Sequence, residues 1–179
     1  MRIISGKHKG KRIIAPKNLP VRPTADMQKE ALFNILNNYY DFNSVKILDL
    51  FSGTGNIAYE FASRGTNDIT TVDENFLCVN FIRKTANEFE FPIDTVKSDV
   101  FKFLEKTAQQ FDMIFADPPY QMDETLFYKI VEIVFEKKLL SKIGMLIIEH
   151  SKFTNFEKIP HFSFSRSYGG SVFSFFEIK

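Results

Sequence analysis

The sequence predicts an α/β fold built on one mostly parallel sheet of seven strands. Short apolar runs of strand length alternate with helical patterns along most of the 179 residues. Glycines and acidic residues stand at the ends of several of these runs, where open α/β sheets bind ligands. Near the C-terminus two strand patterns follow each other directly, which predicts an antiparallel hairpin at the edge of the sheet.

The chain begins with a segment that we expect to form a β-hairpin arm. Ile3 and Ile4 on one side, and Ile13 and Ile14 on the other, flank a turn bounded by glycines. β-Branched pairs around such a turn favour a hairpin over a disordered tail. A linker with two prolines follows, so we assign residues 1–23 to the arm and its linker.

Residues 24–179 are expected to form a single domain. Thr24 is predicted to cap a first helix, with Asp26 in its first turn. The alternation then predicts strands at 45–51, 69–73, 93–97, 111–116 and 144–149, helices at 57–64, 76–89, 100–107 and 124–137, and paired strands between 162 and 178. Right-handed crossovers would place the first five of these strands in parallel.

Composition and charge exclude several classes of protein. No run of 18 apolar residues is present, so we predict neither a membrane span nor a secretory signal. Cys78 is the single cysteine, which rules out an intramolecular disulfide and favours a reducing cytoplasm. The net charge of +1 conceals an asymmetry, because residues 1–25 contain seven basic side chains and no acidic one. This arm predicts a polyanionic partner, and the alternative is a solvated basic tail.

A glycine-containing turn after the 45–51 strand indicates a nucleoside-binding site. Gly53 and Gly55 let the backbone approach a ligand closely, and the next helix presents free N–H groups. With Ala58 they match the Gly/Ala form of a dinucleotide fingerprint. Asp73 ends the next strand, where a carboxylate would accept hydrogen bonds from ribose hydroxyls. The pattern predicts a nucleoside-containing cofactor without identifying it.

Asp99 follows the third strand of the domain. Its carboxylate could accept a hydrogen bond from the exocyclic amine of adenine, with the Val100 amide near the ring. The alternative is an ordinary helix N-cap. Its place after Asp73 favours the adenine contact. The predicted cofactor-binding residues are Asp49, Phe51, Ser52, Gly53, Gly55, Asp73, Asp99 and Val100.

The segment Asp117-Pro118-Pro119-Tyr120 follows the 111–116 strand. A carboxylate, two prolines and an aromatic ring form a rigid polar tip beside a stacking surface, which suits a planar group with an amine. The Asp117 carboxylate and the Pro118 carbonyl would accept the amine hydrogens, and Tyr120 would stack on the ring. We predict these four residues as the catalytic segment.

Other polar residues are interpreted as structural. Glu149 and His150 end the 144–149 strand and could line a pocket, but we favour a solvated pair at a strand end. No cluster with metal-ligand spacing is present, so no metal site is predicted.

Taken in order, the segment 49–55, Asp73, Asp99 and the segment 117–120 resemble the motifs of S-adenosylmethionine-dependent methyltransferases acting on exocyclic amines. The arm and the block Arg22-Pro23-Thr24 are similar to those of the bacterial 16S ribosomal RNA guanine-N2 methyltransferases. This resemblance spans nearly the whole chain. It implies a Rossmann-like class I methyltransferase fold, S-adenosylmethionine as cofactor and a guanine N2 as methyl acceptor.

The resemblance also implies a partner, which is 16S ribosomal RNA or the assembling small ribosomal subunit. A monomer is expected. The RNA-binding residues would be Arg2, Lys7, Lys9, Lys11, Arg12, Arg22, Thr24 and Lys29. Members of the family usually have an arginine where Met27-Gln28-Lys29 stands, and Lys29 is expected to supply that charge without reproducing the guanidinium fork.

Four other functions were weighed against this one. A DNA adenine-N6 methyltransferase shares the segment 117–120, but the chain has no spare region for target recognition. Methyltransferases of release-factor glutamine typically have Asn in the place of Asp117. An NAD-dependent oxidoreductase would explain the glycine turn but neither the segment 117–120 nor the basic arm. A non-catalytic RNA-binding module would leave the predicted pocket unused.

Overall fold

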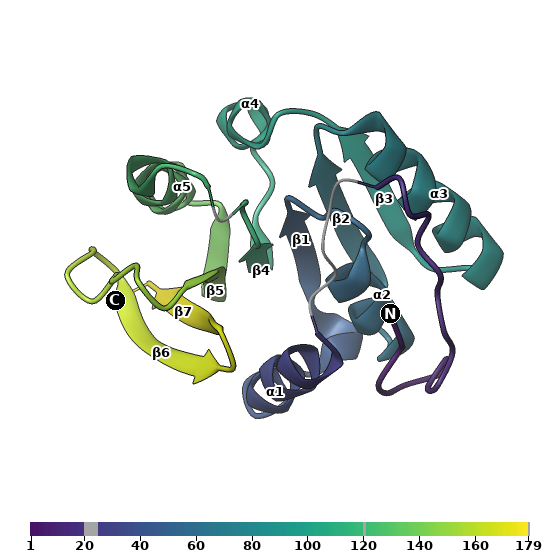
Figure 1. Ribbon diagram of the computed structural model, residues 1–179. Helices are drawn as coiled ribbons and strands as arrows, with labels where there is room; N and C mark the ends of the chain where they lie inside the picture. The colour runs from purple at the N-terminus through teal and green to yellow at the C-terminus, as the bar shows by residue number, and fades with distance from the viewer. Residues whose placement is uncertain (20–24, 120, 179) are drawn as a thin grey trace.

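The computed structural model describes residues 1–19, 25–119 and 121–178 of the chain. Within these residues seven strands form one twisted sheet in the order β3-β2-β1-β4-β5-β7-β6 (Figure 1). The strands are β1 (Lys46–Leu50), β2 (Asp68–Asp73), β3 (Ile93–Lys97), β4 (Phe111–Ala116), β5 (Leu140–Ser151), β6 (Phe162–Tyr168) and β7 (Ser171–Glu177). The helices are α1 (Asp26–Leu36), α2 (Asn56–Ser63), α3 (Phe76–Phe89), α4 (Val100–Lys106) and α5 (Glu124–Glu136), with a 3-10 turn at Phe42–Ser44.

The pairing of the strands confirms the predicted α/β fold. β1 to β5 pair in parallel, and β7 runs antiparallel between β5 and β6. β6 and β7 form the predicted hairpin, which turns at Gly169 with a positive φ of 61°. The strand order reverses between β1 and β4, so the carboxyl ends of these two strands diverge into loops on opposite faces.

Alternating side chains divide the sheet into two apolar faces. Ile47 of β1 packs in a cluster with the apolar residues of α1 and α2. Leu48, the next residue, packs with those of α4 and α5 on the other face. α3 joins the side of α2, because Ile82 packs against Tyr59. Both faces are therefore covered, as the continuous apolar runs of parallel strands require.

Among the five parallel strands, β1 and β2 differ from their predicted bounds by no more than a single residue at either end, and only β5 differs by more. β5 begins at Leu140, whereas the sequence pattern predicted a start at Gly144. The register between β4 and β5 shifts after the pair Phe111–Leu140 and resumes at Met113–Met145. The extra residues on β5 form an irregular start that alternation of apolar residues alone does not detect.

The arm is docked on the domain and has short antiparallel pairing. Arg2 and Arg12 form an isolated bridge, and the Ile3 amide donates to the Lys11 carbonyl at 2.9 Å. Ile3 and Ile13 are buried in a cluster with α2 and α3. The predicted hairpin is confirmed as a turn with paired ends, but its strands are too short to form a ladder.

The first helix starts one residue later than expected. Ala25 occupies the N-cap position of α1 and makes no side-chain cap bond, while Asp26 stands in the first turn as predicted. Thr24, for which we predicted the cap, lies outside the described residues, as does the boundary between 23 and 24. The division of the chain there stays a prediction. No helix in the described part of the chain has the length and apolar character to cross a bilayer.

Candidate functional site

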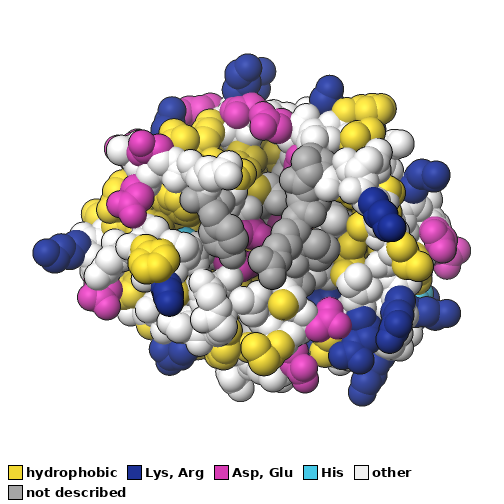
Figure 2. Space-filling model, viewed as in Figure 1, with side chains coloured by type: hydrophobic (Ala, Val, Ile, Leu, Met, Phe, Trp, Pro, Cys, Tyr) yellow, Lys and Arg dark blue, Asp and Glu magenta, His cyan; other side chains and the backbone are white. Residues whose placement is uncertain are grey.

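A cavity of about 830 Å³ lies at the carboxyl ends of the parallel strands. It occupies the reversal point between β1 and β4, where open α/β sheets bind their ligands. Figure 2 shows acidic side chains in the central hollow of this face. The predicted residues that line the cavity are Asp49, Phe51, Ser52, Gly53, Asp73, Asp99, Val100, Asp117, Pro118 and Pro119. The structure thus brings both predicted halves of the site, the glycine turn and the segment after β4, into one cavity.

The turn between β1 and α2 has an unusual backbone. Phe51, Gly53 and Gly55 all have positive φ, at 55°, 52° and 80°. A side chain at Gly55 would be doubly disfavoured, because an ideal Cβ there would lie 2.7 Å from the Tyr59 ring. Phe51 tolerates the left-handed region less well than glycine, and such strain is concentrated at functional sites. The turn exposes backbone amides to the cavity at the start of α2.

Asp73, at the end of β2, is hydrogen-bonded to the turn that follows β1. Its Oδ2 accepts a hydrogen bond from the Gly53 amide at 2.8 Å, and its Oδ1 accepts one from the Asn75 amide at 2.8 Å. Each carboxylate oxygen can accept a further bond, so hydroxyl groups of a ligand can still be bound. The ribose contact predicted for Asp73 stays a prediction, and the structure adds that this residue also holds the glycine turn in place.

Asp99 has the structural role that was weighed against adenine recognition. It is the N-cap of α4, where its Oδ1 accepts a bond from the Lys102 amide at 2.9 Å. The two roles are compatible, because the second carboxylate oxygen is not used by the cap. Val100, the first residue of α4, is buried and lines the cavity next to Asp99.

Asp49 is a buried acid whose charge is poorly compensated. Its side chain is 2% exposed, and Oδ2 has no hydrogen-bond partner among the described residues. Burial, followed by the charge of Asp73, raises the pKa of Asp49 to about 8, against a smaller opposing effect of the Ala58 amide. An acid in such a position is ionised most easily when a cation binds beside it.

Asp117 lies at the end of β4 next to two other acids. Burial raises the pKa of its carboxyl group well above the usual range, and the charges of Glu149 and Asp49 raise it further. Pro118 is buried and Pro119 is exposed at the cavity. Tyr120, predicted as the stacking residue, lies outside the described residues.

The solvated pair predicted at the end of β5 is wrong. Glu149 is 3% exposed and His150 is 2% exposed. His150 bonds through Nε2 to the Ser174 hydroxyl at 2.7 Å and packs edge-on against Phe156, so it belongs to the core. Glu149 lines the cavity, and burial raises the pKa of its carboxyl group. The prediction failed because β7 and the segment after β5 cover a strand end that would otherwise be open to water.

Several lining residues were not predicted. Some of them stand one or two positions beyond a predicted strand end and could have been found by extending that rule: Glu74, Asn75 and Ser151. Others come from distant parts of the chain and have no local signal: Ala25, Gln28, Met122, Leu126, Gly170 and Ser171. The side-chain amide of Gln28 donates to the Tyr168 carbonyl at 3.0 Å, which connects α1 to the β6–β7 turn beside the cavity.

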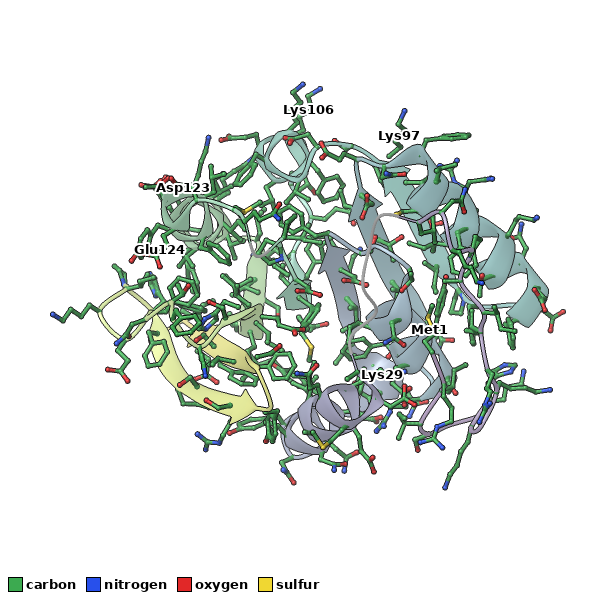
Figure 3. The ribbon with its side chains drawn as sticks, in the orientation of Figure 1. Met1, Lys29, Lys97, Lys106, Asp123 and Glu124 are labelled. Carbon is green, nitrogen blue, oxygen red and sulfur yellow. The ribbon has the colours of Figure 1, made fainter. Side chains whose placement is uncertain are left out.

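Lys29 has a structural role in place of the predicted RNA contact. Its side chain is 1% exposed, and Nζ donates to the Arg2 carbonyl at 2.6 Å and to Asn56 Oδ1 at 2.7 Å. It also pairs with Glu60, at 3.3 Å between Nζ and Oε2. Figure 3 shows Lys29 on α1 near Met1. We withdraw the RNA contact for Lys29, because its ammonium is enclosed between α1, α2 and the arm.

The other predicted RNA-binding residues that the structure describes are exposed. They are Arg2, Lys7, Lys9, Lys11 and Arg12, and Figure 2 shows basic side chains gathered at the lower right, where the arm lies in Figure 1. Arg22 and Thr24 lie outside the described residues. RNA binding by this surface stays a prediction. Within the described residues, no group of three or more His, Cys, Asp or Glu could hold a metal ion.

The strand order, with β7 antiparallel beside β5, is that of the Rossmann-like methyltransferases. Two methyltransferases of similar fold have been solved with S-adenosylmethionine or S-adenosylhomocysteine bound. The residues present here fit such a cofactor. The unpartnered oxygen of Asp49 suits its cationic groups, and Asp73 and Asp99 each retain acceptor capacity for the nucleoside. The fold and the cavity are those of a Rossmann-like methyltransferase.

The comparison with known proteins narrows the class to a family. The model of the family described as "Conserved hypothetical protein 95" matches residues 1–177, and the chain belongs to this family. The putative rRNA methyltransferase YlbH of Bacillus subtilis is 31% identical over 157 residues, covering 85% of this chain and 83% of YlbH. Ribosomal RNA small subunit methyltransferase D of Buchnera aphidicola (from Acyrthosiphon pisum) is 31% identical over 153 residues, covering 84% and 78%. The structure of the putative methyltransferase yhhF of Escherichia coli superposes with a TM-score of 0.86 at 19% identity, covering 100% and 99%.

Proposed function

We propose that this protein transfers the methyl group of S-adenosylmethionine to the exocyclic N2 of a guanine in small-subunit ribosomal RNA. The observation that supports this most directly is the joint cavity. It unites the nucleoside-type loops after β1, β2 and β3 with the segment Asp117-Pro118-Pro119 after β4. The names of two relatives, a putative rRNA methyltransferase and a ribosomal RNA small subunit methyltransferase, support ribosomal RNA as the substrate.

The chemistry requires help from the protein because the guanine amine is a weak nucleophile. Its lone pair is delocalised into the ring. Acceptors at the Asp117 carboxylate and the Pro118 carbonyl would bind the two amine hydrogens and turn the lone pair toward the methyl group. S-Adenosylmethionine supplies that methyl on a positively charged sulfur and leaves as neutral S-adenosylhomocysteine. Positioning and electrostatics then account for most of the acceleration.

The proton balance involves Asp117. As N2 forms its bond to the methyl carbon, the electron pair of the carbon–sulfur bond stays on sulfur and N2 becomes cationic. The nitrogen then loses one proton easily. The raised pKa of Asp117 makes its carboxylate a better acceptor for that proton than an exposed aspartate. Glu149 and Asp49 cause part of this shift, so the cluster of acids supports the reaction beyond simple hydrogen bonding.

The site also constrains the state of the RNA. A guanine stacked in a helix cannot insert its edge between Asp117 and the loop after β1, so the base must be unpaired or flipped out. The exposed basic residues of the arm would bind the phosphates around it. An assembling small ribosomal subunit in the cytoplasm is the partner that this arrangement favours, since a short arm recognises little sequence by itself.

Radiolabelled methyl transfer tests the proposal. Small subunits and naked 16S RNA from a strain that lacks the gene are incubated with the protein and labelled S-adenosylmethionine, and the modified nucleotide is mapped. We expect label in a single guanine as N2-methylguanine. Label in adenine, or in DNA and not in RNA, would instead support the adenine-N6 alternative. Calorimetry with S-adenosylhomocysteine and with NAD is the parallel measurement, and binding of NAD alone would overturn the assignment.

A further inference from the structure

Glu149 is a buried acid of the cavity whose role in the methyl transfer described so far is limited to its effect on the pKa of Asp117. It is the third residue from the end of β5, its side chain is 3% exposed, and its Oε2 has no hydrogen-bond partner among the described residues. A hydrogen bond with the side chain of Ser171 on β7 holds its carboxyl group. The bond with Ser171 fixes the carboxyl group in place, and Glu149 is one of the residues that line the cavity.

An unpartnered carboxylate oxygen in a buried place is costly for a protein to maintain. Buried polar atoms almost always have a hydrogen-bond partner. An atom without one in the free protein is a candidate for a hydrogen bond with a ligand. None of the ion pairs formed between described residues involves Glu149. The charged groups nearest to it are acids, since Glu149 raises the pKa of Asp117. Oε2 therefore has no donor among the described residues, and a bound molecule with an N–H group would supply one.

The register of the sheet places Glu149 beside the catalytic segment. β4 and β5 are parallel neighbours, with Ala116 paired to Ile148. Asp117 follows Ala116 directly after β4, and Glu149 follows Ile148 on β5. Neighbouring strands lie about 4.8 Å apart. An amine held by Asp117 and Pro118 thus has Glu149 beside it, at a spacing that suits two adjacent donors on the edge of one base.

Guanine has such a pair of donors. Its N2 amine and its N1–H lie next to each other on the Watson–Crick edge, whereas N1 of adenine is an acceptor. We propose that Glu149 Oε2 accepts the hydrogen bond from guanine N1–H while Asp117 and Pro118 hold N2, which makes Glu149 the residue that selects guanine. This inference rests on the proposed function and deepens it by assigning the choice of base.

The selection works by leaving the wrong base unsatisfied. A base whose N1 is an acceptor would place a lone pair against the carboxylate and leave Oε2 without a donor. Sites built to hydrogen-bond a particular group discriminate strongly against analogues that lack it. The same argument explains how a site with an acid, two prolines and an aromatic residue could avoid adenine amines.

The test compares two bases that share the N2 amine and differ at N1 and at C6, where 2-aminopurine lacks the carbonyl oxygen of guanine. The substrate on which the modified guanine has been mapped is prepared by splinted ligation with either guanine or 2-aminopurine at that position. Methyl transfer is measured over a range of alkaline pH, because burial raises the pKa of the Glu149 carboxyl group and the contact requires its ionised form. The wild-type protein should prefer guanine by about 100-fold in kcat/KM. In Glu149→Gln the preference should fall below about 5-fold, because the amide can donate to the N1 of 2-aminopurine.

Controls separate base selection from folding and from the proposed function. Glu136→Gln, at the exposed end of α5, should retain the wild-type preference. Affinity for S-adenosylhomocysteine should stay within a few-fold in Glu149→Gln. If this variant folds poorly, Ser171→Ala, which removes the hydrogen bond that holds the Glu149 carboxyl group, is measured in its place. If it turns over too slowly, competition of the two RNAs for the complex with S-adenosylhomocysteine measures the same preference.

Two results would overturn the inference, and they differ from failure of the proposed function. A wild-type protein that methylates guanine and 2-aminopurine equally well has no N1 recognition. An unchanged preference in Glu149→Gln would show that another group reads N1. Absence of any guanine methylation by the wild-type protein would instead remove the proposed function, on which the role of Glu149 depends.

Discussion

Three carboxyl groups at the carboxyl ends of β1, β4 and β5 share one cavity. Burial is the largest cause of the raised pKa of each of them, Asp49, Asp117 and Glu149. Like charges so close together disfavour one another, and a cationic ligand relieves the repulsion. The cluster therefore favours a positively charged cofactor and a base rich in donors over a phosphate-bearing dinucleotide such as NAD.

Asp117→Ala separates catalysis from cofactor binding. The carboxylate would contact the amine and not the nucleoside, so methyl transfer should fall by about 10²–10³-fold or more. Affinity for S-adenosylhomocysteine, measured by calorimetry, should stay within a few-fold. Asp117→Asn keeps one acceptor and should lose less. A variant that no longer binds S-adenosylhomocysteine would contradict the role assigned to Asp117.

Asp49→Asn should change how stability depends on pH. The folded protein raises the pKa of Asp49 to about 8, above its unfolded value, so its contribution to stability is complete at low pH and is lost as pH rises toward 8. Between about pH 5 and pH 8 the wild type should lose up to about 1.4 kcal/mol per pH unit relative to the variant. Urea unfolding at several pH values measures the difference. Saturating S-adenosylhomocysteine should reduce it, and parallel pH profiles would show that Asp49 is not the titrating group.

The site residues that could be predicted from sequence are those whose roles depend on a strand end. Asp49, Asp73 and Asp117 each follow or end an apolar run, and parallel strands bring such ends to one edge. Lys29 and Glu149 could not be placed in this way. The environment of Lys29 depends on the docking of the arm, and that of Glu149 depends on β7, which is distant in sequence.

At the scale of elements, α2 is the support for the arm. Glu60, fully buried on α2, accepts hydrogen bonds from the amides of Ile4 and Ser5 at 2.9 and 3.0 Å. It is also paired with Lys29 and Arg64. Removing one partner of a buried ion pair destabilises the fold, because the other charge then remains buried without compensation. The arm is thus fixed to the helix whose first turn borders the cavity, which gives it a defined position relative to the site.

Gly6→Ala and Gly10→Ala form a matched pair that tests this docking. Both glycines have a positive φ, 83° and 82°, so both substitutions carry a conformational cost of about 1–2 kcal/mol. Only at Gly6 would the new Cβ collide, 1.8 Å from the Ser63 carbonyl oxygen, whereas nothing lies within 4 Å at Gly10. Gly6→Ala should therefore lower the unfolding free energy more than Gly10→Ala and expose the arm to limited proteolysis. Equal effects would mean that the arm does not dock on α2.

The fold was predictable to the extent that its elements have local signals. The helix at 76–89 and the strands at 93–97 and 111–116 have the predicted bounds, because apolar periodicity and clear turns delimit them. β5 was predicted too short, since its first residues pair across a register shift that leaves no alternation in the sequence. The arm pairs less than predicted because its few residues gain more from burial on α2 and α3 than from a longer ladder.

At the scale of the whole molecule, charge is separated between the arm and the domain. The first 25 residues have a formal charge of +7, while the rest of the chain has 16 basic and 22 acidic residues. The acids include those of the cavity, and the exposed basic residues of the arm lie together (Figure 2). Such a distribution orients a polyanion, because the arm attracts phosphates and the domain repels them. An unpaired base could then enter the acidic cavity while its flanking phosphates stay on the arm.

Replacing Lys7, Lys9, Lys11 and Arg12 by glutamine tests this orientation. The side chains are exposed, so the fold should be retained while affinity for 16S RNA decreases. The slope of log affinity against log salt should flatten by up to about 3. Each phosphate contact that is lost leaves fewer counterions to be released when the RNA binds. Filter binding at several salt concentrations measures this. The control replaces four exposed lysines elsewhere, Lys106, Lys138, Lys142 and Lys158, by glutamine and should leave the slope nearly unchanged. If both variants alter the slope equally, the arm is only one part of a diffuse basic surface and does not orient the RNA.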